Sequence, residues 1–320
     1  MPACTVAIPV FNQRAFIERA VRSALAQGVD ALDIVVVDNQ SEDGTWEALQ
    51  PFTRHGVRLH RNASNLGLFG NFNRCLELAG SSYLRLLAGD DVLAPGSLRA
   101  ELELMERNAG LAMLSTRGRF VSPEGAAMGA FADDFPAGVY DGGSFALTWF
   151  DYYARTRRNP LNYPSGVLFR RSAIGGLRFE EGWRTAGDID FYFRVLRQGD
   201  LGIADFPGCE VTRHPAQAHV GPNLDGTAIR EQIALLERHV DEAARAGLLK
   251  HLAGSCLALA LLRCWSSATR DSAVIHLRLA TELASPPAAA FGLAALVGWR
   301  AARSLLAKWM PCLPRPLRPL

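Results

Sequence analysis

Apolar runs and helical patterns alternate along the first 90 residues, and this alternation is the strongest constraint on the fold. Three short apolar runs indicate strands, at 5–10, 32–37 and 82–87, and residues 57–60 are expected to form a further strand. Segments whose apolar residues have helical spacing lie between the strands, at 16–24, 41–52 and 68–78. The run at 32–37 is continuously apolar, as expected for a strand covered on both faces. The pattern predicts a parallel α/β sheet with right-handed crossovers.

The remaining sequence extends this sheet and then becomes helical. We predict a helix at 98–105, a strand at 111–121, a loop at 122–143, a strand at 166–169 and a helix at 188–196. Beyond residue 221 Ala/Leu-rich helical sequence follows, up to a Pro-rich tail from Pro311 that cannot be helical. We expect two halves of one α/β domain, at 1–110 and 111–220, and a helical region at 221–320.

Composition and charge narrow the classes of function. The chain has 320 residues and a formal net charge of +2, which argues against a dedicated nucleic-acid binder. Its six cysteines have no paired spacing, so we expect free thiols in a reducing compartment. We find no signal-peptide pattern and no stretch of about 20 uncharged apolar residues. These features predict a cytoplasmic protein without a membrane-spanning helix.

The adjacent acids Asp90 and Asp91 directly follow the run at 82–87. Ligands bind at the carboxyl ends of strands in open α/β sheets, so both carboxylates would lie at that edge. Two acids there can hold a divalent cation, and the cation can in turn hold a diphosphate. Gly89-Asp90-Asp91 is also ordinary turn chemistry, and the pair taken alone favours that interpretation.

Polar residues also follow the other predicted strands. Pro9-Val10-Phe11-Asn12 ends the first strand, and Asp38-Asn39 ends the second. Asn65 and Gly67 lead into the next helix, which carries Asn71. Neither a Gly-x-Gly-x-x-Gly sequence nor a P-loop occurs, so the two commonest nucleotide cradles are absent.

Taken in order, these motifs resemble those of a family 2 glycosyltransferase with a GT-A fold. The matching stretches are 6–12, 35–41 with Asp43-Gly44-Thr45, Asn65-x-Gly67, Asp90-Asp91, and Asp188-x-Asp190 followed by Arg194. Each motif is weak alone, but five in the same order and spacing are specific, and the resemblance covers residues 4 to 220. It implies a Rossmann-like, mostly parallel sheet with flanking helices, to which this chain adds a C-terminal helical extension.

The resemblance implies transfer of a sugar from a nucleotide-diphosphate donor to an acceptor hydroxyl, with inversion at the anomeric carbon. Asp188 matches the family's catalytic base, and Asp91 with Asp90 matches its Mg²⁺ or Mn²⁺ site. His214 matches a position that completes the metal shell or meets the diphosphate. The residues that match the nucleotide-sugar site are Pro9, Val10, Phe11, Asn12, Asp38, Asn39, Asn65, Gly67, Asn71 and Asp90.

Trp183 and Arg184 precede the base, where they would stack on or grip an acceptor. Two other positions depart from the family's pattern. Asn39 stands where many relatives have a second acid, and Ala88 stands where many have the first acid of Asp-x-Asp. A metal would then have fewer carboxylate ligands.

Structural roles are the alternatives at several of these positions. His214 is then a loop histidine, Asp188 a helix cap, and Trp183 a lid or core residue. Asn65 and Gly67 are then a plain turn. Asp190, two residues past the candidate base, is expected to cap the helix or orient a loop.

The C-terminal region carries a basic excess. Residues 241–320 hold ten Lys/Arg and four Asp/Glu, and no acid follows Glu282. Apolar stretches, tryptophans and this charge suggest contact of 250–310 with an anionic membrane surface. The alternative, equally open, is that these helices pack on the catalytic domain or form a dimer contact. A position at the inner face of the cell membrane would suit a lipid-linked acceptor.

The sequence therefore predicts a metal-dependent inverting glycosyltransferase of the hexosyltransferase type. It would act on a lipid-linked or saccharide acceptor in bacterial surface polysaccharide or glycolipid synthesis. The alternative is a catalytically degenerate relative that binds a nucleotide-sugar or a partner without turnover. A sugar nucleotidyltransferase would need a Gly-rich, Arg-bearing loop after the first strand, which Pro9-Val10-Phe11-Asn12 is not.

Overall fold

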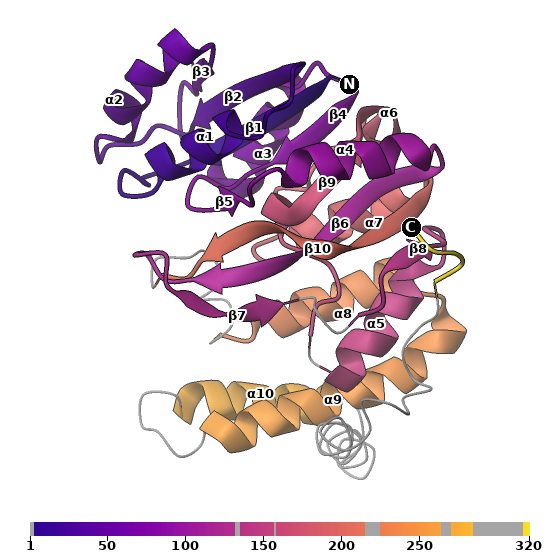
Figure 1. Cartoon of the computed structure of the whole chain (residues 1–320). Coiled ribbons are helices and arrows are strands. Elements are labelled where there is room, and N and C mark those ends of the chain that lie inside the picture. The colour runs from indigo at the N-terminus through magenta and orange to yellow at the C-terminus, as the bar shows by residue number, and fades with distance from the viewer. Residues whose placement is uncertain (1–2, 132–134, 157, 215–224, 264–269, 284–315) are drawn as a thin grey trace.

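One ten-stranded sheet forms the centre of the described chain (Figure 1). The computed structural model describes residues 3–131, 135–156, 158–214, 225–263, 270–283 and 316–320. The strand order is β3-β2-β1-β4-β9-β6-β10-β5, with β7 paired to β6 and β8 paired to β10.

Four parallel strands form the N-terminal half of the sheet, as the alternation predicts. They are β1 (Cys4–Val10), β2 (Leu32–Asp38), β3 (Arg58–Arg61) and β4 (Tyr83–Leu86). The intervening helices are α1 (Ile17–Leu25), α2 (Thr45–Leu49) continued by the 3-10 helix η1 (Gln50–His55), and α3 (Gly67–Leu78). The register pairs Val10 with Asp38, so the loops after β1 and β2 leave the sheet at the same level.

The second half of the sheet is mixed. β6 (Leu111–Val121) and β10 (Asp200–Thr212) run parallel, while the remaining pairs are antiparallel. The other strands are β5 (Val92–Leu93), β7 (Ala127–Phe131), β8 (Gly138–Tyr140) and β9 (Val167–Arg170). The helices are α4 (Ser97–Arg107), α5 (Phe145–Thr156), η2 (Pro164–Gly166), α6 (Arg171–Ile174) and α7 (Gly187–Leu196).

The expected loop at 122–143 is wrong in part, because β7 and β8 lie within it. β7 has no buried face to leave a pattern in the sequence, since four of its five residues are exposed. It is held by backbone pairing with β6 and by Phe131, whose ring centroid lies 4.4 Å from that of Phe120. β10 was not predicted either, because Gly202, Pro207 and Gly208 interrupt its apolar pattern.

The C-terminal region is helical, as expected. It comprises α8 (Thr227–His239), α9 (Glu242–Arg263) and α10 (Arg270–Leu283). Figure 1 shows α9 and α10 side by side at the end of the molecule away from β2 and β3, with α5 and α8 next to α9. Parts of the predicted membrane-contact region 250–310, namely 264–269 and 284–310, lie outside the described residues. None of the helices described is both long enough and apolar enough to cross a membrane.

The last five residues, 316–320, return to the edge of the sheet in extended form. The backbone N–H of Val139 in β8 donates to the Arg318 carbonyl at 2.9 Å, and the Leu317 N–H donates to the Val139 carbonyl at 2.6 Å. This agrees with the prediction that the Pro-rich tail is not helical, for the part of the tail that is described.

Two apolar layers cover the two faces of the sheet. Alternate residues of β1 separate them: Val6, Ile8 and Val10 join one cluster and Ala7 joins the other. Helices α1, α2 and α4 contribute to the first cluster, and α3, α5, α7 and α8 contribute to the second. Burial on both faces explains why β1 and β2 are apolar without alternation.

A buried ion pair joins β4 to α4 beneath the sheet edge. Arg85 and Glu101 are both fully buried and contact each other directly. Arg85 also donates to the carbonyl of Gly208 in β10 at 3.2 Å. Burial raises the pKa of Glu101 to about 7, and only the opposing charge of Arg85 and hydrogen bonds limit the rise.

We predict that Arg85→Met lowers the free energy of unfolding by about 3–5 kcal/mol, because it leaves the Glu101 carboxylate buried without an opposing charge. The double variant Arg85→Met/Glu101→Leu should recover most of that loss, since it removes both buried charges. Urea unfolding followed by tryptophan fluorescence measures both. Equal stability of the single and double variants would contradict this interpretation of the pair.

Candidate active site

A cavity of about 530 Å³ lies at the carboxyl ends of β1, β2 and β4. Its walls come from the loops after these strands, the start of α3, η2 with the residue before it, the start of α7 and the end of β10 with the two residues after it. β1 pairs in parallel with both β2 and β4, so the ends of all three strands reach the same edge. Polar residues far apart in the sequence therefore meet in one place.

The Asp91 carboxylate is buried in the cavity wall and fixed by two hydrogen bonds. Ser165 Oγ donates to Oδ2 at 2.5 Å, and the backbone N–H of Thr212 donates to Oδ1 at 3.0 Å. The Thr212 hydroxyl donates to the carbonyl of Asp90. These contacts join the turn after β4 to η2 and to the end of β10.

Asp90 contacts a histidine that lines the same cavity. Its Oδ2 lies 2.9 Å from Nε2 of His214, and the His214 ring stacks on Phe16 with 5.0 Å between centroids. Arg19 supports the same corner, because its guanidinium donates to Thr212 Oγ1 at 2.7 Å. The predicted trio of Asp90, Asp91 and His214 is therefore gathered at one end of the cavity.

The electrostatics of this corner favour a cation. Burial and the neighbouring Asp90 carboxylate raise the pKa of Asp91 well above its ordinary value. A divalent ion would stabilise the ionised form of Asp91. Carboxylate oxygens with one imidazole are ligands that suit Mg²⁺ or Mn²⁺. Among the residues that the structure describes, no three His, Cys, Asp or Glu side chains are arranged as a metal cluster. Substrate oxygens and water would therefore complete the shell.

Asp188 stands in the first turn of α7, half-buried in the cavity wall. The N-cap of this helix is Ala186, so Asp188 is not the cap. Loss of solvent raises the pKa of Asp188 to about 6, and the Glu231 carboxylate adds to the rise. Such a carboxylate is ionised at neutral pH yet binds a proton more strongly than an exposed aspartate, which suits a general base.

Gly187 allows α7 to begin close to the cavity. A Cβ atom at this position would lie 2.5 Å from Cζ of Phe69, a cavity-lining ring of α3. Asp190 has a structural role instead. It is fully buried, and its carboxylate contacts Arg194 at 2.8 Å and His239 Nε2 at 2.8 Å.

Four asparagines form a neutral network at the other end of the cavity. Asn39 Oδ1 accepts from the Leu66 N–H and from Asn62 Nδ2, both at 2.9 Å. Asn39 Nδ2 donates to Asn65 Oδ1 at 2.7 Å and to the Gly67 carbonyl at 3.2 Å. Asn62 also donates to Asn71 Oδ1 at 2.9 Å. Both ends of the Asn39 amide are thus used in holding the loop that leads into α3.

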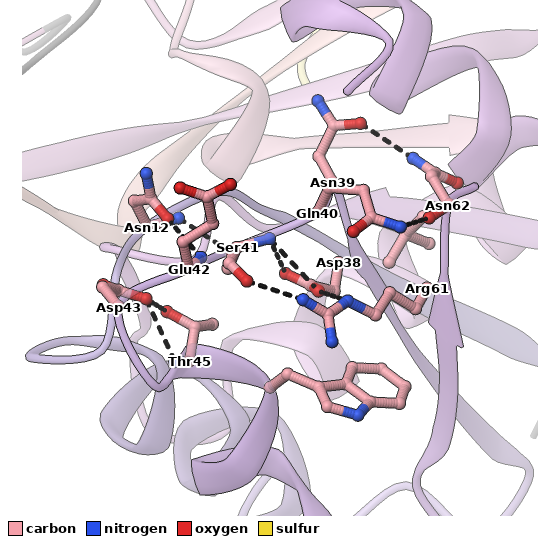
Figure 2. A network of polar contacts seen from close by, with 12 residues as sticks. Asn12, Asp38, Asn39, Gln40, Ser41, Glu42, Asp43, Thr45, Arg61 and Asn62 are labelled. Carbon is pink, nitrogen blue, oxygen red and sulfur yellow. Dashed lines mark hydrogen bonds and ion pairs between the residues drawn. The ribbon is translucent and has the colours of Figure 1, made fainter. Parts of the chain in front are cut away.

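Asp38 and Asn12 do not line the cavity but belong to a network of polar contacts between the loops after β1 and β2, which Figure 2 shows. The Asp38 carboxylate pairs with Arg61 Nε at 3.0 Å and accepts from the Ser41 N–H at 3.2 Å. The Asn12 backbone N–H donates to Ser41 Oγ at 2.9 Å, and its Oδ1 accepts from the Glu42 N–H at 2.9 Å. Both side chains hold the loops after β1 and β2 together.

The cavity brings together most of the residues that the sequence singles out: Pro9, Val10, Phe11, Asn39, Asn65, Gly67, Asn71, Asp90, Asp91, Arg184, Asp188 and His214. Trp183, like Asp38 and Asn12, does not line it, and this half-buried ring packs on the apolar core. Arg184 lies at the exposed rim, 3.2 Å from Asp225.

Sequence reasoning missed several lining or supporting residues, among them Ser165, Thr212 and Arg213. Ser165 and Thr212 hold Asp91 but belong to no local motif. Arg213 lines the cavity with its guanidinium 4.0 Å from the centroid of the Phe120 ring. Its position next to His214 is the one signal that could have indicated it.

The sheet has a GT-A fold, as its similarity to two solved glycosyltransferase structures shows. TarS of S. aureus, solved with UDP-GlcNAc, matches with a TM-score of 0.63 and 13% identity over 94% of this chain and 92% of that one. Mannosyltransferase PcManGT of Pyrobaculum calidifontis, solved with GDP-Man and Mn²⁺, matches with a TM-score of 0.56 and 17% identity over 96% of this chain and 88% of that one.

The family model described as glycosyl transferase family 2 matches residues 5–176, and the chain belongs to this family. Uncharacterized protein MT1568 of Mycobacterium tuberculosis is 43% identical over 98 residues, 31% of each chain. The GalNAc(5)-diNAcBac-PP-undecaprenol beta-1,3-glucosyltransferase of Campylobacter jejuni is 32% identical over 102 residues, 31% of this chain and 33% of that one. The matches thus span about a third of these relatives' lengths. Asp188 lies beyond the family-model match.

We predict that Asn39→Asp is destabilising by about 1–3 kcal/mol. A carboxylate cannot donate to Asn65 Oδ1 or to the Gly67 carbonyl, so two hydrogen bonds become repulsive contacts. Thermal and urea unfolding measure the change.

Asn65→Asp is the matched control for this variant. It adds the same charge to the same network, but Asn65 Oδ1 acts as an acceptor toward both Asn39 and the Gly67 N–H. The control should retain near wild-type stability. Equal losses in the two variants would mean that charge, and not the lost donor, causes the effect.

Proposed function

We propose that this protein is an inverting glycosyltransferase that moves a sugar from a nucleotide-diphosphate donor to an acceptor hydroxyl. The observation that carries the proposal is the cavity itself. It holds Asp188, whose pKa is raised to about 6, together with the Asp90-Asp91 turn. One carboxylate is thus suited to take a proton, and an acidic pair is suited to bind a cation beside a diphosphate.

Inversion in a single displacement requires a base on the face opposite the leaving group. Asp188 takes the proton of the acceptor hydroxyl. At the same time the oxygen of that hydroxyl forms the new bond to the anomeric carbon. The bond from that carbon to the diphosphate oxygen breaks, and the nucleoside diphosphate leaves with the electron pair. Carboxylates near the ring also stabilise oxocarbenium character in the transition state.

Asp91 and Asp90 would hold Mg²⁺ or Mn²⁺ in this proposal, with His214 beside them. The ion neutralises charge on the diphosphate when bound. The hydrogen bonds from Ser165 and the Thr212 N–H keep the Asp91 carboxylate in place whether or not the ion is present. PcManGT, whose structure contains Mn²⁺ with its nucleotide-sugar, supports this assignment.

The asparagine-held loop would contact the nucleotide, and Arg184 at the rim would contact the acceptor. A lipid-linked or saccharide acceptor in bacterial surface polysaccharide or glycolipid synthesis fits the relatives, one of which is named for an undecaprenol-linked substrate. The excess of basic residues from 241 onward would attract anionic lipids, which supports a cytoplasmic enzyme that acts at the inner face of the cell membrane. Contact through 250–310 is part of this proposal.

We predict that Asp188→Asn lowers kcat by about 10²- to 10⁴-fold, because the amide cannot take the acceptor proton. Donor binding should remain, since the diphosphate end of the cavity is unchanged. The assay is nucleoside diphosphate release with whichever of UDP-GlcNAc, UDP-glucose and GDP-mannose the wild type turns over, and calorimetry measures donor binding.

Glu181→Gln is the matched control, because it removes the same charge from an exposed residue seven positions earlier. It should retain wild-type kcat. Full turnover by the Asp188 variant would refute the assignment of the base. A wild type that binds a nucleotide but turns over no donor would favour the catalytically degenerate alternative.

The pKa of Asp188, raised to about 6, also predicts the pH dependence of the reaction. The base works only when ionised, so kcat/KM should be level above that pH and fall about tenfold per pH unit below it. Measurement of kcat/KM from about pH 4.5 to about pH 8 covers both the level part of the profile and its fall on the acid side. A limb near pH 4, as for an ordinary aspartate, would contradict the account.

A further inference from the structure

Glu231 on α8 binds the segment that leads into the catalytic helix. Its Oε1 accepts from the Arg184 backbone N–H at 2.6 Å, and its Oε2 accepts from the N–H groups of Thr185 and Ala186 at 2.8 and 3.0 Å. The Thr185 hydroxyl also donates to Oε2 at 2.5 Å. One carboxylate thus satisfies three consecutive backbone donors just before Gly187.

This carboxylate lies at the N-terminal end of α7. The N-cap residue of α7, Ala186, has no side chain that can accept from the first turn. A carboxylate at that end satisfies free N–H groups and interacts favourably with the helix dipole. Glu231 supplies this interaction from another helix, 45 residues further along the chain than Ala186.

A second contact fixes the same two helices relative to each other. Asp190 of α7 lies 2.8 Å from His239 Nε2 and 3.3 Å from the Arg238 guanidinium, both near the end of α8. The two helices are therefore joined both before the first turn of α7 and within it. Rotation of α7 that would turn Asp188 away from the cavity would break both contacts.

We propose that Glu231 is a positioning residue for the transfer reaction: it fixes the Arg184–Ala186 segment and the start of α7 so that Asp188 faces the cavity. The inference rests on the proposed role of Asp188 as the base. It gives the helical region after residue 221 a part in catalysis, because Glu231 belongs to α8.

Glu231 also acts on Asp188 through its charge. The like charge raises the pKa of Asp188, after the larger effect of burial. Other titratable or charged groups line the same cavity: Asp90, Asp91, Tyr163, Arg184, Arg213 and His214. Tyr192 of α7 does not line the cavity but also interacts electrostatically with Asp188. Removing the Glu231 charge alone should therefore lower the pKa of Asp188 and move the acid limb of the rate profile to lower pH.

The test compares Glu231→Gln, Glu231→Ala and Thr185→Val with the wild type in the donor assay. Glu231→Ala should lower kcat by about 10- to 100-fold, with donor KM little changed, because small displacements of a catalytic group have effects of this size. Glu231→Gln keeps one acceptor oxygen and should lower kcat less, with its acid limb moved to lower pH. Thr185→Val removes one hydrogen bond to Glu231 and should give the smallest loss.

Glu237→Gln is the matched control, since it removes an exposed carboxylate from the same helix. It should keep both kcat and the acid limb of the wild type. If Glu231→Ala fails to fold, Glu231→Gln and Thr185→Val still decide the question. Wild-type kcat and an unmoved acid limb in Glu231→Gln would overturn the inference.

Asp188→Asn, assayed beside these variants, separates the inference from the proposed function. Loss of turnover in Asp188→Asn with no effect of Glu231→Gln overturns the positioning role alone. Retained turnover in Asp188→Asn overturns the assignment of the base, and the positioning role with it. Loss in Asp188→Asn together with the expected changes in Glu231→Gln supports both.

Discussion

The buried Asp91 carboxylate is the contact on which the rest of the site depends. Ser165 and the Thr212 N–H hold it, and so the turn after β4 is tied to η2 and to the end of β10. Burial beside Asp90 opposes its ionisation, and two hydrogen bonds offset this only in part. In the proposed function, a cation at this corner would offset the negative charge of the two carboxylates.

The cavity is divided into ends of different chemistry. Carboxylates and His214 gather at one end, while a neutral network of asparagines holds the other. A donor with a charged diphosphate and a neutral base matches this division. Asp188, the proposed catalytic base, belongs to neither end, and Glu231 and His239 of α8 contact the residues around the start of α7. The helical extension is therefore continuous with the active site.

The sequence predicts what depends on local pattern. The strands β1 and β2 are evident because burial on both faces requires unbroken apolar runs, and the edge motifs follow from where the strands end. β7 is not evident, because its residues are exposed and its strand is set by pairing. Ser165 and Glu231 contact residues far away in the sequence, so no local sequence pattern predicts their roles. Asn39 was recognised as unusual, but its four hydrogen bonds depend on where the chain places Leu66 and Asn62.

Melting of the wild-type protein with UDP, GDP, dTDP or CMP, each with and without Mn²⁺, tests the central claim most directly. Binding to the folded state raises Tm by mass action. The account predicts a rise with one nucleoside diphosphate that is larger when Mn²⁺ is present. No rise with any nucleotide in either condition would contradict a metal-assisted nucleotide-sugar site at Asp90 and Asp91.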